Sequence, residues 1–146
     1  MPEHLSYVSP GFGEANLKSH AYVQAVRVGD TIHLSGQGGW DRETNKTHKD
    51  HDAQIDQAFD NIDYNLRYAG GQGWSQVYKV RSYHLALNDE AQDAMVRNFR
   101  KWMPGEKHAL WTCVQVPRFG EDNMRVEIEV EAYDPEGAAA ARESKK

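Results

Sequence analysis

The sequence predicts an α+β fold in which one mixed β-sheet carries two helices on one face. Three observations support this fold class. Residues 124–132 alternate between apolar and polar side chains, which is the period of a strand buried on one side. Residues 55–69 place apolar side chains three and four positions apart, which is the period of an amphipathic helix. Along the chain, the patterns give the order strand, strand, helix, strand, helix, strand, strand.

Composition limits the classes of function. The chain has 146 residues, enough for one domain with a hydrophobic core. A net charge of −5, without a local run of Lys or Arg, argues against a protein that binds nucleic acid by neutralising phosphates. Cys113 is the only cysteine, so no intrachain disulfide can form and a reducing compartment is expected.

The chain divides into three parts. Residues 1–20 have prolines and glycines at positions 2, 10, 11 and 13 and are predicted to be an N-terminal loop segment. Residues 21–133 form the domain, and residues 134–146 are predicted to be an exposed C-terminal tail that is either frayed or a short helix. The sequence shows neither a leader pattern nor a run of about 18 apolar residues. We therefore expect a cytoplasmic protein without membrane contact, although organellar import stays compatible with the sequence.

The first three strands follow from local alternation and turn chemistry. Residues 22–28 alternate weakly, Gly29 and Asp30 supply a turn, and residues 31–35 resume as a strand, which predicts a hairpin. Residues 77–87 are rich in β-branched and aromatic side chains and are predicted to be the third strand.

The two helices have recognisable start and stop signals. Asp50 or Asp52 can cap the first helix, which ends at two glycines. Asn88 or Asp89 can cap the second helix, which Pro104 stops. The predicted apolar stripe of the first helix consists of Ile55, Ala58, Phe59, Ile62, Leu66 and Ala69. That of the second helix consists of Met95, Phe99 and Trp102 or Met103.

Two motifs between these elements carry little chemistry on their own. The glycine-rich residues 36–39 lack the lysine and helix start of a phosphate-binding loop, which favours a bulge or turn at a strand end. His48 and His51 are three positions apart in a hydrophilic stretch, and this context favours a solvated loop over a metal site.

Residues 108–133 are predicted to form a hairpin of two long strands. The first arm spans residues 110–117, and residues 120–123 supply the turn. Parity places Trp111 and Cys113 on one face of the first arm.

One face of the predicted sheet has no helices. Trp111 and Tyr83 are expected to point toward it, and packing against a second copy of the chain would cover them. Glu127, Glu129 and Glu131 share the polar face of the last strand. Their mutual repulsion requires either water or a partner that supplies donors or positive charge, and a solvated face is the simpler interpretation for Glu129 and Glu131.

Several segments of the chain, taken in order, match the pattern of one family. They are Tyr22–Val26, Gly29-Asp30, Leu34–Gln37, Gln57–Ile62, Leu66 with Ala69-Gly70, Leu87–Asp89, Thr112–Val116 and Val126–Glu129. Their order and spacing hold from about Ala21 to Ala132 and resemble the Rid family, also called YjgF. The resemblance implies a chorismate-mutase-like fold assembled as a homotrimer, with three pockets in the clefts between subunits. It also implies hydrolysis of imines and enamines, such as 2-iminopropanoate, to a keto acid and ammonia, without a metal or organic cofactor.

The resemblance assigns site residues by position. The family's pocket tyrosine matches Tyr22, its glycine backbone contact matches Gly36, and its asparagine after the third strand matches Asn88. Its pocket cysteine matches Cys113, and its water-orienting glutamate matches Glu127. Glu127 would accept a proton from water or a hydrogen bond from a ligand N–H, or it would serve as an ion-paired carboxylate at the interface. Cys113 has no basic neighbour in the sequence, so a buried small side chain is favoured over a nucleophile.

One position departs from the family pattern. The family's arginine, which holds the substrate carboxylate two residues before the cysteine, is replaced by Trp111. Indole offers one N–H and no charge, whereas guanidinium offers a planar pair of donors. Losing such a contact to a buried anion costs about 2–5 kcal/mol, so small imino acids should bind poorly. Trp111 is expected to line a larger, more apolar pocket or to fill it, and Arg125 is a weaker candidate for holding a carboxylate.

Three functions stay open at this point. The first is an enzyme that hydrolyses or tautomerises a neutral or aromatic imine or enamine in the intersubunit cleft, through water activated by Glu127. The second is a non-catalytic small-molecule binder or interaction trimer that has kept the scaffold. The third is an RNA-cleaving protein, an activity attached to the family by name, which the acidic balance of the chain disfavours.

Overall fold

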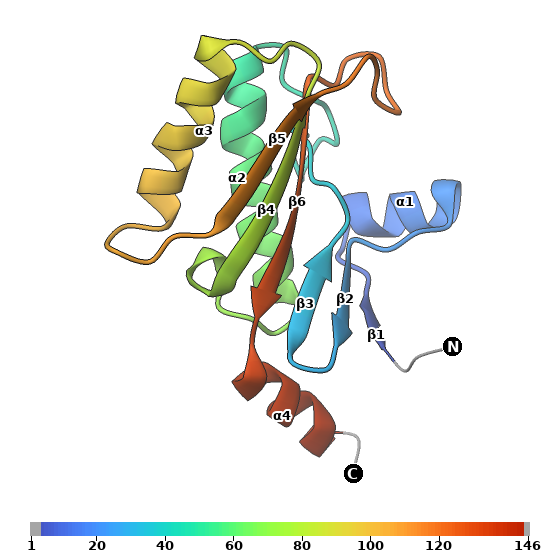
Figure 1. Cartoon of the computed structure of the whole chain (residues 1–146). Coiled ribbons are helices and arrows are strands. Elements are labelled where there is room, and N and C mark those ends of the chain that lie inside the picture. Colours follow the sequence, from blue (N-terminus) through green and yellow to red (C-terminus); the bar gives the residue numbers. More distant parts are fainter. Residues whose placement is uncertain (1–3, 145–146) are drawn as a thin grey trace.

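The computed structural model describes residues 4–144 and has one six-stranded sheet with two long helices on one face (Figure 1). The strands are β1 (Leu5–Tyr7), β2 (Ala25–Val28), β3 (Thr31–Leu34), β4 (Val77–His84), β5 (Leu110–Gln115) and β6 (Val126–Tyr133). The helices are α1 (Phe12–His20), α2 (His51–Tyr68), α3 (Asp89–Trp102) and α4 (Pro135–Ser144), with a short 3-10 helix at Gly73–Gln76. The spatial order is β1-β2-β3-β6-β4-β5. One mixed sheet covered by α2 and α3 confirms the predicted α+β fold class.

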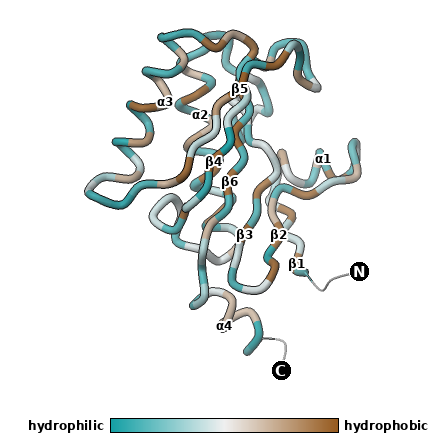
Figure 2. The backbone as a smooth tube through the Cα atoms, viewed as in Figure 1, coloured by the Kyte–Doolittle hydropathy of each residue, from teal (hydrophilic) through white to brown (hydrophobic). Residues whose placement is uncertain are grey.

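The two predicted helices start where capping chemistry allows. The Asp50 carboxylate accepts a hydrogen bond from the backbone N–H of Ala53 at 2.9 Å and begins α2. The Asn88 side chain accepts one from the backbone N–H of Ala91 at 2.9 Å and begins α3. Along α3, hydrophilic and hydrophobic stretches alternate, as expected for a helix with one buried face (Figure 2). No helix within residues 4–144 is both long and apolar enough to cross a membrane.

The predicted hairpin of residues 108–133 is wrong. β4 lies between its two arms, pairing in parallel with β5 and antiparallel with β6. A parallel neighbour needs a long crossover connection, which α3 provides between β4 and β5. Alternation and turn residues report only local structure, so they cannot show that a third strand is inserted between two consecutive ones.

The register also corrects the predicted position of Trp111. Val80 of β4 is paired with Trp111 of β5 and with Val130 of β6. Val80 and Val130 are buried beneath the helices, so Trp111 shares the helix-covered face and does not point toward the open one. Tyr83 does lie on the open face as expected, because it is paired with Glu127.

The N-terminal segment contains regular structure where composition predicted a loop. β1 adds to the sheet edge, with Tyr7 opposite Ala25. α1 has little amphipathic character, and it is held by tertiary contact instead, because the Phe12 ring stacks on Trp40 with ring centroids 3.9 Å apart. A helix that lacks an apolar stripe gives no periodic signal in the sequence.

The C-terminal segment begins in the protein interior, and the helix α4 that follows is largely exposed. Asp134 is 1% exposed and pairs with the buried Arg27 at 2.8 Å. Burial alone would raise the pKa of Asp134, but the donors of Arg27, Gln76 and Gly137 outweigh burial and lower it. This ion pair anchors the start of α4 against the β2 side of the sheet.

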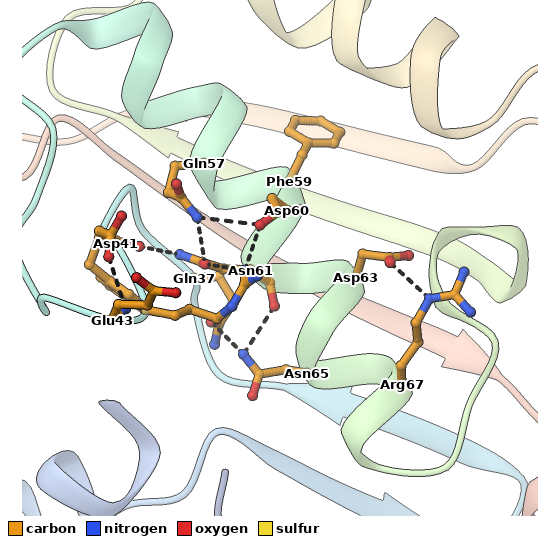
Figure 3. A network of polar contacts seen from close by, with 12 residues as sticks. Gln37, Asp41, Glu43, Gln57, Phe59, Asp60, Asn61, Asp63, Asn65 and Arg67 are labelled. Atoms are coloured by element: carbon orange, nitrogen blue, oxygen red, sulfur yellow. Dashed lines mark hydrogen bonds and ion pairs between the residues drawn. The ribbon is translucent and has the colours of Figure 1, made fainter. Parts of the chain in front are cut away.

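Buried amide side chains on α2 hold the loops next to the sheet (Figure 3). Asn61 donates hydrogen bonds to the carbonyls of Gly38 and Trp40, each at 2.9 Å. Gln54 is fully buried and donates to the carbonyls of His48 and Asn123, at 2.7 and 3.0 Å. Its own amide oxygen accepts the backbone N–H of Arg125 at 2.8 Å.

We expect Gln54→Met to destabilise the protein strongly although it nearly conserves side-chain volume. The change leaves two carbonyls and one N–H without their partner, so the free energy of unfolding should fall by about 3 kcal/mol in chemical denaturation. Gln92→Met is the matched control, because Gln92 lies exposed on α3. Equal effects of the two variants would contradict the anchoring role of Gln54.

Candidate functional site

A cleft of about 490 Å³ opens beside the start of β6. It lies between α1, the loop after β3 and the loop before β6. Its lining includes Phe12, Ala15, Asn16, Ser19, His20, Tyr22, Trp40, Asn45, Thr47, Gly120, Glu121, Asn123, Met124 and Glu127. This lining contains no Lys or Arg among the residues that the structure describes, so the cleft presents neutral polar groups, two carboxylates and apolar surface but no fixed positive charge.

Glu127 is the carboxylate at the floor of this cleft. Its side chain is half-buried and has no hydrogen bond or ion pair with any other residue in the described part of the chain. Burial raises its pKa, and the nearby Glu129 raises it further. The other two glutamates of β6 are paired: Glu129 accepts from the Tyr83 hydroxyl, and Glu131 lies 3.5 Å from His33.

Gly36 makes room for the Glu127 side chain. A Cβ atom at position 36 would lie 2.5 Å from both Cγ and Oε1 of Glu127, which is closer than carbon contacts allow. The absence of a side chain at this position therefore allows the carboxylate to occupy this place.

The Tyr22 phenol faces the same cleft. Its hydroxyl donates to the Asn16 side-chain oxygen at 3.0 Å, so its own oxygen presents lone pairs to the cleft. Burial raises the pKa of Tyr22, Gln24 lowers it, and the Glu127 charge raises it. Tyr22 and Glu127 together present hydrogen-bond acceptors, which suits a ligand that carries N–H groups.

The other three predicted site residues lie elsewhere on the subunit. Trp111 and Cys113 are half-buried on the helix-covered face of β5, opposite to the face of Glu127. Asn88 is at the start of α3, where its side-chain oxygen already caps the helix. One chain therefore brings together Tyr22, Gly36 and Glu127. It keeps Asn88, Trp111 and Cys113 apart from them.

A line of polar side chains extends inward from Trp111. The indole N–H donates to the Ser82 hydroxyl at 2.9 Å, and Ser82 lies 3.0 Å from His84 Nε2. Because indole can only donate, the Ser82 oxygen accepts from Trp111, and the His84 tautomer sets which of Ser82 and His84 donates to the other. The His84 ring lies 6.1 Å from that of His51, and Nδ1 of His84 and Nε2 of His51 are buried without partners among residues 4–144.

Sequence reasoning missed several residues of both regions. Asn16 and Phe12 belong to α1, which has no periodic signal, and His51 faces His84 only because α2 and β4 meet in space. Arg125 donates its backbone N–H to Gln54 and does not line the cleft. Within residues 4–144, no group of three or more His, Cys, Asp or Glu side chains could hold a metal ion.

Comparison with known proteins agrees with this architecture. Residues 13–134 match the family model described as Endoribonuclease L-PSP. The chain is 32% identical over 118 residues to the RutC family protein YjgH of Escherichia coli K12, which covers 80% of this chain and 86% of that protein. A solved structure of protein YJGH has a TM-score of 0.77 at 25% identity and covers 93% of this chain and 99% of that one. RidA from the Antarctic bacterium Psychrobacter sp. PAMC 21119 has a TM-score of 0.69 at 32% identity and covers 79% and 89%, respectively.

The buried His84 should make stability depend on pH. Burial, and secondarily the neighbouring His51, lowers the pKa of His84 to about 4, from 6.5. The unfolded chain therefore binds a proton that the folded chain does not between about pH 6.5 and 4, so stability falls as the pH falls through this window. Between pH 7 and 4, the free energy of unfolding of wild type should fall by about 3 kcal/mol more than that of His84→Gln, as measured by denaturant titration. His20→Gln, which removes an exposed imidazole, is the control, and equal pH slopes in wild type and His84→Gln would contradict the assignment.

Proposed function

The chain belongs to the Rid family, also called YjgF, and from this premise we propose that it assembles as a homotrimer with a small-molecule site in each intersubunit cleft. At this site, Glu127 activates water to hydrolyse or tautomerise an imine or enamine other than the usual 2-imino acids. Tyr22 and Gly36 accompany Glu127 on one subunit, and Asn88, Trp111 and Cys113 come from its neighbour.

The unpaired state of Glu127 is the observation that carries this proposal. A half-buried carboxylate without a donor is costly to keep, whereas Glu129 and Glu131 on the same strand face have partners. Its raised pKa brings it closer to the range in which a carboxylate accepts and returns protons efficiently. A role in chemistry accounts for both features.

The separation of the site residues supports the intersubunit location. Trp111 and Glu127 lie on opposite faces of one sheet, so a single subunit cannot bring them to one ligand. A second copy, placed with its β5 edge beside the cleft of the first, would unite the two sets. The open face of the sheet, which carries exposed Tyr133 and Val28, offers apolar surface for such packing.

The charges around the cleft determine the substrate class. Glu121 and Glu127 line the cleft, no Lys or Arg among the described residues does, and Trp111 occupies the position of the family's arginine. A substrate carboxylate would meet repulsion and no guanidinium. A neutral or protonated imine with an aromatic or apolar substituent would instead donate its N–H to Glu127 or Tyr22. The same absence of basic residues gives no support to RNA as the ligand.

The proposed reaction needs only water and proton transfers. Glu127 takes a proton from water while the water oxygen bonds to the imine carbon, and the proton passes to the nitrogen, giving a carbinolamine. Glu127 then removes the hydroxyl proton and delivers it to the nitrogen as the C–N bond breaks. The products are a carbonyl compound and ammonia, so no electrons leave or enter the system.

Glu127→Gln should abolish ammonia release from a neutral imine that a flavin amine oxidase produces in situ from phenylethylamine. The amide cannot accept the water proton, so the rate should fall by at least about a hundredfold. The activity of wild type should fall as the pH is lowered, with a midpoint above 4.5, the ordinary carboxyl pKa. The reason is that activity needs the ionised carboxylate and that the pKa of Glu127 is raised.

Glu131→Gln makes the same charge change four residues further along the same face of β6 and should retain activity. Light scattering should give three chains per particle for wild type and both variants. A trimer whose turnover is the same in wild type and Glu127→Gln would exclude catalysis by Glu127, and a trimer without any turnover would favour the non-catalytic binder.

Gly36→Ala should reduce activity by about tenfold or more while the protein stays folded. The added methyl group overlaps the Glu127 carboxylate and displaces it from the cleft floor. Gly120→Ala is the matched control, because Gly120 also lines the cleft but a Cβ atom there would contact nothing within 4 Å. Full activity in Gly36→Ala, measured by the same ammonia assay, would show that the observed carboxylate position is not required.

A further inference from the structure

We propose that His20 is a second catalytic residue of the Glu127 cleft, where it gives a proton to the imine nitrogen while Glu127 takes one from water. This inference rests on the function proposed above and adds to it the source of the proton that makes a neutral imine reactive. His20 is the last residue of α1, Glu127 belongs to β6, and both line the same cleft of about 490 Å³. That volume is typical of a pocket for one small molecule, so side chains of both elements surround a single ligand.

The Ser19 hydroxyl determines which nitrogen of His20 is available to a ligand. Ser19 Oγ lies 2.8 Å from the backbone carbonyl oxygen of Ala15 and 2.6 Å from His20 Nδ1. A carbonyl oxygen can only accept, so the single hydroxyl hydrogen goes to Ala15, and Ser19 then accepts the N–H of Nδ1. We assign this tautomer because the reverse arrangement would leave two oxygen atoms in contact without a hydrogen between them. Nε2 has no hydrogen-bond partner among residues 4–144, and it is therefore the nitrogen that exchanges a proton.

The turn after α1 brings His20 next to Tyr22. Ala21 has a φ of 59°, in the left-handed region, and its N–H donates to the carbonyl of Leu17 at 3.1 Å. Residues with a side chain rarely adopt this backbone conformation, and glycine is the usual residue for it at a helix end. The turn lets the side chains on both sides of Ala21 line the cleft. The rings of His20 and Tyr22 meet edge to face, with centroids 6.5 Å apart and planes at 72°.

The other polar groups of the cleft are poor sources of this proton. The Tyr22 hydroxyl donates to Asn16, whose own amide N–H donates to the carbonyl of Phe12 at 3.0 Å. Glu127 must be ionised to accept a proton from water, and amides and aliphatic hydroxyls keep their hydrogens near neutral pH. Imidazole is the side chain that gains and loses a proton in this range. Among the described residues that line the cleft, only His20 carries one.

The proton transfers of the shared reaction balance. Protonated His20 gives its Nε2 hydrogen to the nitrogen of a neutral imine. The oxygen of water bonds to the resulting iminium carbon while Glu127 removes a water proton, which gives a carbinolamine. Glu127 passes that proton to the amine nitrogen and then takes the hydroxyl proton as the C–N bond breaks. The products are a carbonyl compound and ammonia, and the proton left on Glu127 returns to His20 through solvent.

The test compares two substrates that differ in whether the nitrogen needs a proton. A flavin amine oxidase converts phenylethylamine to a neutral imine and N,N-dimethylphenylethylamine to a permanently charged iminium ion. Hydrolysis of either releases phenylacetaldehyde, whose rate of release above the uncatalysed rate is measured with enough oxidase that oxidation does not limit it. We expect His20→Gln to lower the rate on the neutral imine at least about tenfold, because an amide forms hydrogen bonds but does not give up a proton. The rate on the iminium ion should change by less than about twofold, because its nitrogen already carries the charge that His20 provides.

Two further variants separate the role of His20 from that of Glu127. His48→Gln is the matched control, because His48 lies 3.2 Å from the Gln57 side chain and does not line the cleft, so both rates should equal those of wild type. Glu127→Gln should lose both activities. If wild type is active and His20→Gln either keeps full activity on the neutral imine or loses the same factor on both substrates, the role of His20 is wrong and that of Glu127 stands. A wild type that hydrolyses neither substrate, or a Glu127→Gln variant that hydrolyses both, would overturn the proposed function and this inference with it.

Discussion

Hydrogen bonds from the buried amides of α2 hold together the part of the structure on which the cleft depends. Gln54 and Asn61 satisfy carbonyl groups of the loops at residues 38–48 and 123–125. Trp40 and Met124 of these loops are buried in a small apolar cluster, and the hydrogen bonds to α2 fix the polar backbone around them. Trp40 and Asn123, which line the cleft, are both bonded to α2 through their backbone carbonyls.

The elements that could be predicted from the sequence are those whose buried residues recur with a regular local period. Strand β6 and helix α2 each bury one continuous face, so a period of two and a period near 3.6 reveal them. Helix α1 is held by the contact of Phe12 with Trp40, and the pairing of β5 with β4 depends on a crossover. Both features depend on contacts between residues far apart in the chain, and such contacts leave no pattern in the local sequence.

The candidate site divides in the same way. Resemblance to a family could identify Tyr22 and Glu127, because identity and position along the chain are properties of the sequence. It could not show that Glu127 is the one unpaired glutamate of three within the described part of β6, nor that Asn16 accepts the hydrogen bond of the Tyr22 hydroxyl. These properties arise when segments far apart in the chain meet, and they decide the electrostatic character of the cleft.

The position of β6 inside the sheet has a consequence for biosynthesis. Residues 126–133 are among the last of the domain to be made, yet they join β3 on one side to β4 on the other. Until they leave the ribosome, the first three strands and the β4–β5 pair have no shared partner, and their apolar faces stay open to water. A nascent chain of this topology therefore completes its fold late, and chaperones that shield apolar surface have a long interval in which to act on it.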